Sequence, residues 1–373
     1  MTVLAVAALS ARMLAEAGRD DVFDIVALDV FGDADTRRAC SQWASIGAPA
    51  TLRIDAVMLL SALSELARRG DVIGWIAGSG FDAQPDLLAR GAAVLPLIGT
   101  PADAVQRVRD PQTFFDELDR QGIAHPPVQM TAPADAAGWL VKDASGCGGW
   151  HISRALPAQP APAHHYFQRE VAGTPMSATF IANGSNACVL GFNQLIVRPV
   201  GARPFVFCGA VGPVPLLPGV AQRIDAAVRQ IAEAFSLRGL ASLDFMLDGA
   251  AFSVLEVNPR PPASIALYGR HGVVAAHLRA CLHGELPLNS SVRSGGAVQG
   301  SEIVFAPRPI KLDANAAQRL AGLDGCHDLP FAAARFNATD PVCSVSAQGD
   351  TAVQVHGLLA ERCAAVHQFL ETL

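Results

Sequence analysis

Residues 242–260, with the sequence SLDFMLDGAAFSVLEVNPR, form the most informative segment of the chain. Apolar residues alternate with others on both sides of Asp248-Gly249, a pattern typical of two antiparallel strands joined by a tight turn. Side chains alternate along a strand, so Glu256 and Asn258 should lie on the same face. The sequence therefore predicts a hairpin that carries polar side chains on one face.

The register of this hairpin brings acidic residues together. A turn centred near Gly249 sets Asp244 opposite either Leu255 or Glu256. Asp244, Glu256 and Asn258 then offer oxygen atoms to one patch of sheet, and hard oxygen ligands of this kind hold Mg²⁺ against phosphate. The patch predicts a site for a metal and a nucleotide.

Pro259-Arg260 places a guanidinium beside these ligands. The alternative interpretation is that the acidic and amide residues are solvated strand ends, and a lone Glu-x-Asn would carry little weight. The combination of Asp244 upstream with Arg260 downstream favours metal–nucleotide chemistry.

The composition indicates two or three domains or subdomains in 373 residues, of which 51% are hydrophobic. A net charge of −6 argues against a nucleic-acid surface. The eight cysteines are scattered without a CxxC pair, which is typical of free thiols in a reducing cytosol. We therefore expect a cytoplasmic protein.

Two long uncharged segments are not predicted to be membrane helices. Prolines interrupt residues 204–222, and an Asn-Gly turn divides residues 171–197 into a hairpin. Arg12 and Glu16 interrupt the apolar N-terminus too early for a signal peptide. We expect a soluble protein with no membrane partner.

The first part of the chain predicts a small parallel sheet, because strand and helix patterns alternate. No GxGxxG follows the first strand, so a dinucleotide site is poorly supported. Gly78-Ser79-Gly80-Phe81 is equally compatible with a ligand loop and a plain turn. The predicted strands are residues 3–8, 25–31, 72–77 and 93–98, and the predicted helices are residues 10–17, 55–69 and 85–90.

The rest of the chain predicts a second unit and a short final one. A helix over residues 100–121 ends at Gly122, a good C-cap, and leads into strands and hairpins. The later elements are a strand at 140–142, a hairpin of 177–183 and 187–197, a helix at 219–236, a linker near 290–300, and an α+β unit from 302 to 373 with a helix near 355–370.

Lys142 stands at the start of a Gly-rich loop, DASGCGG at residues 143–149, and Lys311 is the only other lysine. Glycines let backbone N–H groups approach phosphate closely, and a lysine supplies a compensating charge. The loop is not a Walker A sequence, which needs Lys-Ser/Thr after its last glycine. Taken alone it favours a hairpin turn, and taken with the acidic hairpin it favours a phosphate site.

The order of these motifs resembles the ATP-grasp superfamily of carboxylate–amine ligases over about residues 109–290. The order is Lys142 with its Gly-rich loop, then Gln168-x₄-Gly173, then Asp244, then Glu256-x-Asn258-x-Arg260. The resemblance implies an α/β and α+β fold: an N-terminal parallel α/β domain at 1–108, an ATP-grasp domain at 109–290 with a lid subdomain at about 138–200, and a C-terminal α+β extension at 291–373.

The same resemblance implies ATP and one or two Mg²⁺ ions as cofactors, with Mn²⁺ as an alternative metal. Lys142 and Arg260 would be catalytic, with Arg260 steadying the acyl phosphate and the oxyanion that follows it. The remaining roles are metal binding by Asp244, Glu256 and Asn258, a phosphate lid of Lys142, Ser145, Gly146, Gly148 and Gly149, and an adenine border of Gln168, Arg169 and Val171.

Softer motifs resemble, more narrowly, the tyramine–glutamate ligase group of methanofuran and methylofuran biosynthesis. This implies a small-molecule acid such as glutamate, an amine such as tyramine or tyrosine, and a role in making a one-carbon carrier cofactor; a homodimer stays open. The motifs are DVFGDADTR at 29–37, GSGFD at 78–82, EIVFA at 302–306, DLP at 328–330 and PVCSV at 341–345.

Two departures from the superfamily pattern leave rival interpretations. Pro111 stands where many members have a lysine, for which Arg107 or Arg109 would substitute, and Pro175-Met176 replaces the usual ribose-binding acid. One rival is a degenerate ATP-grasp protein that acts as a nucleotide-binding assembly partner.

The other rival keeps catalysis with a different acceptor, as in dipeptide or carboxylation enzymes. In that case Tyr268, Arg270 and His271 would face a substrate carboxylate, or simply begin a solvated helix.

Overall fold

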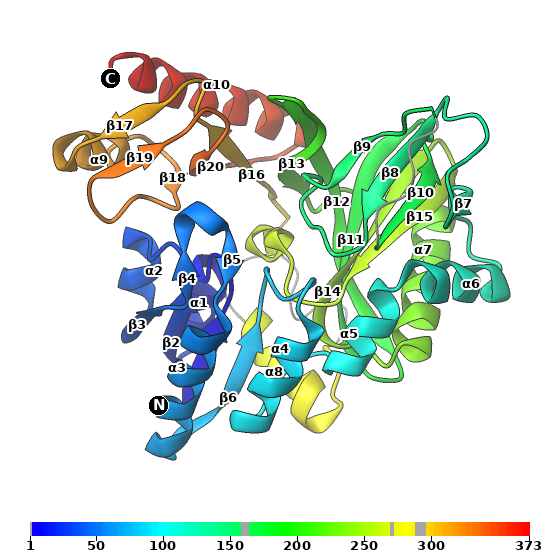
Figure 1. Cartoon of the computed structure of the whole chain (residues 1–373), viewed down its shortest axis with the longest axis horizontal. Coiled ribbons are helices and arrows are strands. Elements are labelled where there is room, and N and C mark those ends of the chain that lie inside the picture. The colour runs from blue at the N-terminus through cyan, green and yellow to red at the C-terminus, as the bar shows by residue number, and fades with distance from the viewer. Residues whose placement is uncertain (1, 158–163, 269–271, 288–295) are drawn as a thin grey trace.

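The computed structural model describes residues 2–157, 164–268, 272–287 and 296–373, and most of the predicted linker near 290–300 lies outside these ranges. The predicted α/β and α+β fold is confirmed. Figure 1 shows the N-terminal unit in blue beneath the C-terminal elements in orange and red, with the strands of a smaller sheet on the opposite side of the molecule.

The N-terminal unit is a parallel sheet in the order β3-β2-β1-β6, as the alternating pattern predicts. Its strands are β1 (Val3–Ala7), β2 (Asp24–Asp29), β3 (Gln42–Ser45) and β6 (Val72–Ala77). Its helices are α1 (Arg12–Asp20), α2 (Ala34–Ala39), α3 (Ala56–Arg69) and α4 (Pro85–Val94), and a hairpin of β4 (Gly47–Ala48) and β5 (Arg53–Ile54) precedes α3.

The strand predicted at residues 93–98 is wrong. Helix α4 runs to Val94, and the segment beyond it touches the sheet only through a bridge between Trp75 and Leu97. Pro96 lacks the N–H that a continued ladder needs, although its carbonyl accepts a hydrogen bond from the Trp75 N–H. A short apolar run does not distinguish the end of a buried helix from a strand.

The single helix predicted over residues 100–121 is two helices, α5 (Ala102–Arg109) and α6 (Pro111–Gln121). Asp110 between them is extended, as the residue before a proline tends to be, and its carboxylate caps α6 by accepting from the Thr113 N–H. Arg109 at the end of α5 lies beside Glu256 of the acidic hairpin.

A four-stranded sheet in the order β7-β10-β8-β9 follows α6. The Gly-rich loop joins β8 to β9, so it lies at the end of this sheet. The strands are β7 (Val128–Gln129), β8 (Trp139–Asp143), β9 (Ile152–Arg154) and β10 (His165–Arg169).

The largest sheet has eight strands in the order β15-β14-β11-β12-β13-β16-β20-β18, with antiparallel pairs throughout. Helices α7 (Pro218–Ala234) and α8 (Val273–His283) pack on its first strands, and α10 (Ala352–Glu371) packs on β16 and β20. The strands are β11 (Thr174–Asn183), β12 (Ala187–Val200), β13 (Arg203–Gly212), β14 (Arg238–Asp248), β15 (Ala251–Asn258), β16 (Val298–Phe305), β18 (Cys326–His327) and β20 (Pro341–Gly349).

Strand β13 was not predicted, because the prolines of residues 204–222 hide it. It pairs with β16, so the C-terminal strands continue the sheet that carries the acidic hairpin. The remaining elements are η1 (Pro49–Thr51), η2 (Ala263–Tyr268), β17 (Ile310–Leu312), α9 (Ala314–Ala321) and β19 (Ala334–Phe336).

Packing between the N-terminal unit and the large sheet fixes the position of the site. The Asp21 carboxylate of the N-terminal unit accepts from the N–H groups of Val274 and Ala275 at the start of α8. On the other face of the sheet, Phe180 and Phe245 are fully buried in a core that includes Ile224 of α7. The hairpin is therefore held from both sides.

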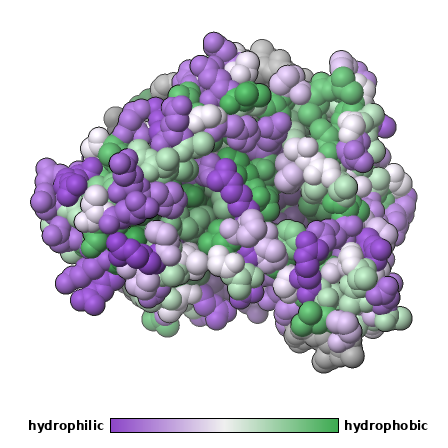
Figure 2. Space-filling view, turned by 90° about the horizontal axis from the view of Figure 1, so that it is seen from above, coloured by the Kyte–Doolittle hydropathy of each residue, from purple (hydrophilic) through white to green (hydrophobic). Residues whose placement is uncertain are grey.

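In the described ranges, no helix combines the length and the apolar character needed to cross a membrane. On the face seen from above, hydrophilic residues gather towards one end of the molecule and hydrophobic residues are visible towards the middle (Figure 2).

Candidate active site

The hairpin of β14 and β15 places Asp244 directly opposite Glu256, one of the two registers that the sequence allows. A β-bulge follows this pair on the side of the turn, and Ser242 lies opposite Asn258 two residues away on the other side. The Asn258 amide donates to Asp244 Oδ2 at 3.1 Å and to Ser242 Oγ at 3.2 Å. Its Oδ1 atom accepts from Arg260 Nη2 at 3.2 Å, so the amide is held in one orientation.

The two carboxylates are close enough to influence each other. Burial, followed by the charge of Glu256, raises the pKa of Asp244 to about 7. Burial also acts to raise the pKa of Glu256, but the nearby charges of Lys142, Arg109 and His151 hold that pKa below its ordinary value. A cation would relieve the repulsion between them, and Asp244 and Glu256 offer hard oxygen ligands that suit Mg²⁺. The Asn258 amide oxygen accepts from Arg260 in this structure and would have to turn towards the carboxylates to join them.

Lys142 on β8 reaches the same region from the smaller sheet. It is 3% exposed, and its Nζ atom donates to Gln168 Oε1 at 3.1 Å. Tyr166 lies opposite Lys142 in the β8–β10 ladder, and the Lys142 Nζ atom is 5.8 Å from the centroid of its ring. Burial opposes the charge of Lys142, but Tyr166 and Glu256 raise its pKa, so the ammonium stays protonated.

The Gly-rich loop is seated against β13. The Phe207 N–H donates to the Gly148 carbonyl at 2.9 Å. Gly149 has a φ of +77°, and a Cβ atom there would lie 1.8 Å from the Phe205 carbonyl oxygen. Only glycine allows this approach. Ser145 is turned towards its own loop, because its N–H and hydroxyl both donate to Asp143 Oδ1.

Arg109 at the end of α5 joins the loop to the hairpin. Its Nη2 atom donates to the carbonyls of Ala144 at 2.9 Å and Gly146 at 2.7 Å, and its Nη1 atom lies 3.5 Å from Glu256 Oε2. Arg107, the other arginine considered in place of the missing lysine, instead donates to the carbonyls of Ala234 and Phe235. Of the two, Arg109 is the cation at the site.

Three further residues at this site were not predicted: Asp82, His151 and Tyr166. Asp82 Oδ2 accepts from Arg260 Nε at 3.2 Å, across 178 positions of sequence. The sequence of the loop that carries Asp82 is equally compatible with a ligand loop and a plain turn. Its GSGFD motif is the one feature of the sequence that indicated a site at this loop. Nothing in the sequence singled out His151 or Tyr166.

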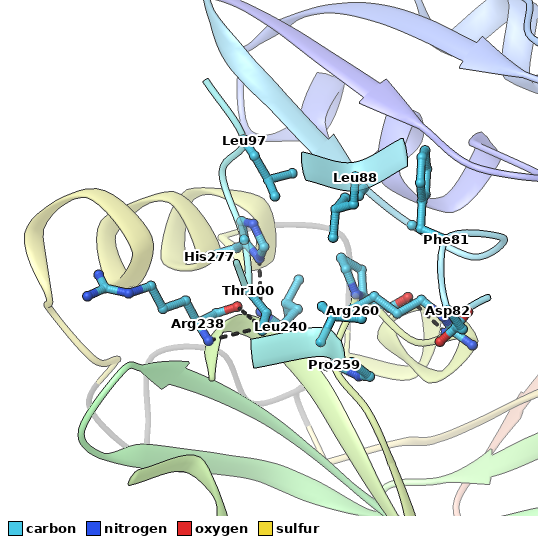
Figure 3. A pocket seen from close by; sticks show the side chains of 15 residues that line it. Phe81, Asp82, Leu88, Leu97, Thr100, Arg238, Leu240, Pro259, Arg260 and His277 are labelled. Carbon is cyan, nitrogen blue, oxygen red and sulfur yellow. Dashed lines mark hydrogen bonds and ion pairs between the residues drawn. The ribbon is translucent and has the colours of Figure 1, made fainter. Parts of the chain in front are cut away.

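A pocket lies beside Arg260, between the N-terminal unit and the hairpin (Figure 3). Its walls are mostly apolar: Phe81, Leu88 and Leu97 come from the N-terminal unit, and Leu240 and Pro259 come from the large sheet. Asp82 and Arg260 form its charged end.

Comparison with known families agrees with this geometry. Residues 108–264 match the model of the ATP-grasp domain, and this range contains Lys142, the Gly-rich loop and the acidic hairpin. Residues 108–264 are therefore similar to the ATP-grasp domain, and the chain has an ATP-grasp fold.

This chain is also similar to parts of much longer curated proteins. It is 27% identical over 232 residues to the carbamoyl phosphate synthase large chain of Thermomicrobium roseum, a match that covers 52% of the chain and 21% of that protein. The chain thus spans about a fifth of the length of the curated relatives it matches.

Solved structures with a similar fold cover nearly the whole chain. L-amino acid ligase from Bacillus licheniformis superposes with a TM-score of 0.70 at 14% identity, over 97% of each chain. A biotin carboxylase–β,γ-ATP complex from Campylobacter jejuni also superposes with a TM-score of 0.70, at 12% identity, over 96% of this chain and 89% of that one. At these identities the similarity establishes the fold.

The ATP-grasp domain does not bring together every residue predicted for its site. Gln168 is buried beside Lys142, but the Arg169 side chain is exposed, donates to the Ala137 carbonyl and lies over the Trp139 ring. Alternation along β10 sends the two side chains to opposite faces. Val171 is half-buried beyond the end of β10.

Tyr268, considered as a substrate contact, is buried and donates to Asn193 Oδ1 at 2.7 Å. It packs the fold and does not face the pocket described above. Arg270 and His271, considered with it, lie outside the described residues.

Proposed function

We propose that this protein is an ATP-dependent ligase that joins a carboxylate to an amine through an acyl phosphate and releases ADP and phosphate. One observation carries the proposal. Asp244, Glu256 and Asn258 share one patch of sheet, and the buried Lys142 and the partly buried Arg109 and Arg260 surround it.

Mg²⁺ held by Asp244, Glu256 and Asn258 would neutralise charge on the phosphates of ATP. Lys142 and Arg109 add positive charge on the side of the Gly-rich loop, and Arg260 adds it on the side of the pocket. Buried, pre-positioned charges of this kind stabilise a transition state more than solvated ones do.

The chemistry has two steps. A carboxylate oxygen attacks the γ-phosphorus, the bond to the β-phosphate oxygen breaks, and ADP leaves. The amine nitrogen then attacks the acyl carbon, the bond to the phosphate oxygen breaks, and phosphate leaves with the electron pair. In this scheme Arg260 stabilises the oxyanion formed between attack and departure.

Glutamate with tyramine or tyrosine is the first substrate set to test, because the softer motifs resemble ligases of methanofuran and methylofuran biosynthesis. Several of these motifs serve the fold. Asp35 of the 29–37 motif accepts from the N–H groups of Asp328 and Leu329 of the 328–330 motif. Motifs that serve the fold in this way support the family resemblance more than they support the identity of the substrates.

A nucleotide-binding partner without catalysis is the second candidate. Pro111 and Pro175-Met176 favour it, since both stand where ligases of the superfamily commonly bind ATP. Arg109 argues against it, because its guanidinium lies beside Glu256 and the loop.

The test is phosphate release from Mg-ATP with glutamate, with and without tyramine or tyrosine, with a bicarbonate arm for a carboxylating activity. We expect amine-dependent release that Glu256→Gln abolishes. ATP binding without turnover, across a wider panel of acids and amines, would favour the nucleotide-binding partner instead.

A further inference from the structure

Asp82, in the loop after β6, has one carboxylate oxygen in use and one free. The residue is 7% exposed, and its Oδ2 atom accepts from Arg260 Nε. The Oδ1 atom is also buried, and no group in the described part of the chain donates to it.

A buried carboxylate oxygen without a donor is destabilising, so its presence needs a reason. Burial acts to raise the pKa of Asp82, but Arg260 and Arg109 hold that pKa below its ordinary value. The group is therefore ionised, and an ionised carboxylate only accepts hydrogen bonds. The missing partner must be a donor.

The free oxygen belongs to the reaction centre. Asp82 binds Arg260, whose Nη2 atom donates to Asn258 Oδ1 at 3.2 Å, and Asp82 lines the pocket at its charged end (Figure 3). It thus lies between the acidic hairpin and the apolar wall of the N-terminal unit.

The charges of the three reactants decide which of them suits this oxygen. The phosphates of ATP and the acid substrate are anionic, so they are drawn to Lys142, Arg109 and Arg260 and repelled by a carboxylate. The amine is the one reactant whose reacting atom carries N–H donors.

We propose that Asp82 Oδ1 binds the N–H of a primary amine, the nucleophile of the ligase reaction; this rests on the function proposed above. Asp82 keeps Arg260 in place with Oδ2 while Oδ1 holds the amine. When the nitrogen lone pair forms the C–N bond, phosphate leaves with the electron pair of the broken C–O bond and takes up one N–H proton, while Asp82 stays ionised. The apolar walls receive the carbon skeleton of the amine.

The test separates the two half-reactions in the full-length protein. Hydroxylamine, a small neutral nucleophile, traps the acyl phosphate as a hydroxamate, and tyramine or tyrosine reports amide formation. Asp82→Asn presents an N–H where the amine needs an acceptor. We expect its KM for the amine to rise on the order of tenfold to a hundredfold, the range for a hydrogen bond to a charged group, with hydroxamate formation within about threefold of wild type.

Asp86→Asn is the matched control, because Asp86 is exposed in the first turn of α4 and loses the same charge. It should leave both readouts unchanged. If Asp82→Asn does not fold, Asp82→Glu keeps the charge beside Arg260 and moves the carboxylate by one methylene, and the same split should appear.

If the Asp82 variants lose hydroxamate formation and amide formation equally, Asp82 acts only by positioning Arg260. That result would overturn the amine-binding inference and leave the proposed ligase function standing. An unchanged KM for the amine would also overturn that inference. Failure of the wild-type protein to form hydroxamate with any acid would reject the ligase itself, and the amine site with it.

Discussion

Arg109 Nη1 lies 3.5 Å from Glu256 Oε2, while Nη2 of the same guanidinium donates to two carbonyls of the Gly-rich loop. One side chain therefore connects a helix end, a loop and a hairpin that are far apart in sequence. The superfamily commonly has a lysine near this point, and a lysine lacks the planar fork that makes these contacts together.

Arg109→Ala should raise the KM for ATP on the order of tenfold to a hundredfold, because charged hydrogen bonds of this kind contribute about 1.5–3 kcal/mol each. Arg109→Lys should restore part of the loss. Steady-state kinetics at varied ATP concentration would measure it. Arg107→Ala, which removes an arginine bound to carbonyls away from the site, should keep the wild-type KM.

Gly149→Ala should prevent the Gly-rich loop from seating on β13. The new Cβ atom would meet the Phe205 carbonyl oxygen, and the positive φ adds strain of about 1 kcal/mol or more. We expect a higher KM for ATP and faster proteolysis within the loop. Gly219→Ala, where no atom lies within 4 Å of the added Cβ, is the control; equal cleavage of both variants would contradict the expectation.

The sequence predicted the geometry of the acidic hairpin better than that of its surroundings. Asp248-Gly249 and the flanking alternation fix the register to within one residue, so Asp244 and Glu256 were placed together correctly. Asp82 meets Arg260 only through the packing of two separate units, and no local pattern encodes that contact.

The errors of the prediction also have physical causes. Strand β13 carries Pro204 and ends before Pro213, and prolines normally argue against a strand inside a sheet. The break at Asp110 was missed because the apolar period of α5 continues into α6, although Pro111 marked the new start.

Asp33→Asn should stabilise the protein increasingly as pH rises. Burial and the charges of Asp328, Asp29 and Asp35 raise the pKa of Asp33 from 3.8 to about 8, against the opposing charge of Arg12. A raised carboxyl pKa means that the native state holds a proton the unfolded state releases, so stability falls from about pH 4 to about pH 8.

The gain in unfolding free energy from Asp33→Asn should therefore be small near pH 4, grow to a few kcal/mol, and level off above pH 8. Thermal or denaturant unfolding across that range would measure it. A gain that does not change with pH would contradict the assignment. The side chain makes no capping hydrogen bond to α2, so its amide replacement loses none.

Arg12→Met should destabilise the contact between the N-terminal unit and the C-terminal strands. Arg12 is 5% exposed and donates to both Asp328 oxygens, at 2.7 and 3.1 Å, and it also pairs with Glu16 and Asp35. Removing one partner of a buried ion pair costs about 3–5 kcal/mol.

The double variant Arg12→Met/Asp328→Asn should recover part of that loss, since it removes one of the carboxylates left unpaired. Denaturant unfolding of both variants would measure the difference. A double variant less stable than Arg12→Met alone would argue that Asp328 contributes through its other contacts.

The pairing of β13 with β16 has a consequence for truncated forms of this protein. A fragment that ends before β16 would turn β13 into an edge of its largest sheet and leave the N–H and C=O groups of residues 209–212, which pair with β16, without partners there. Such an edge pairs readily with another chain. The C-terminal strands therefore also cap the sheet against self-association, and a minimal ATP-grasp fragment should retain them to stay monodisperse.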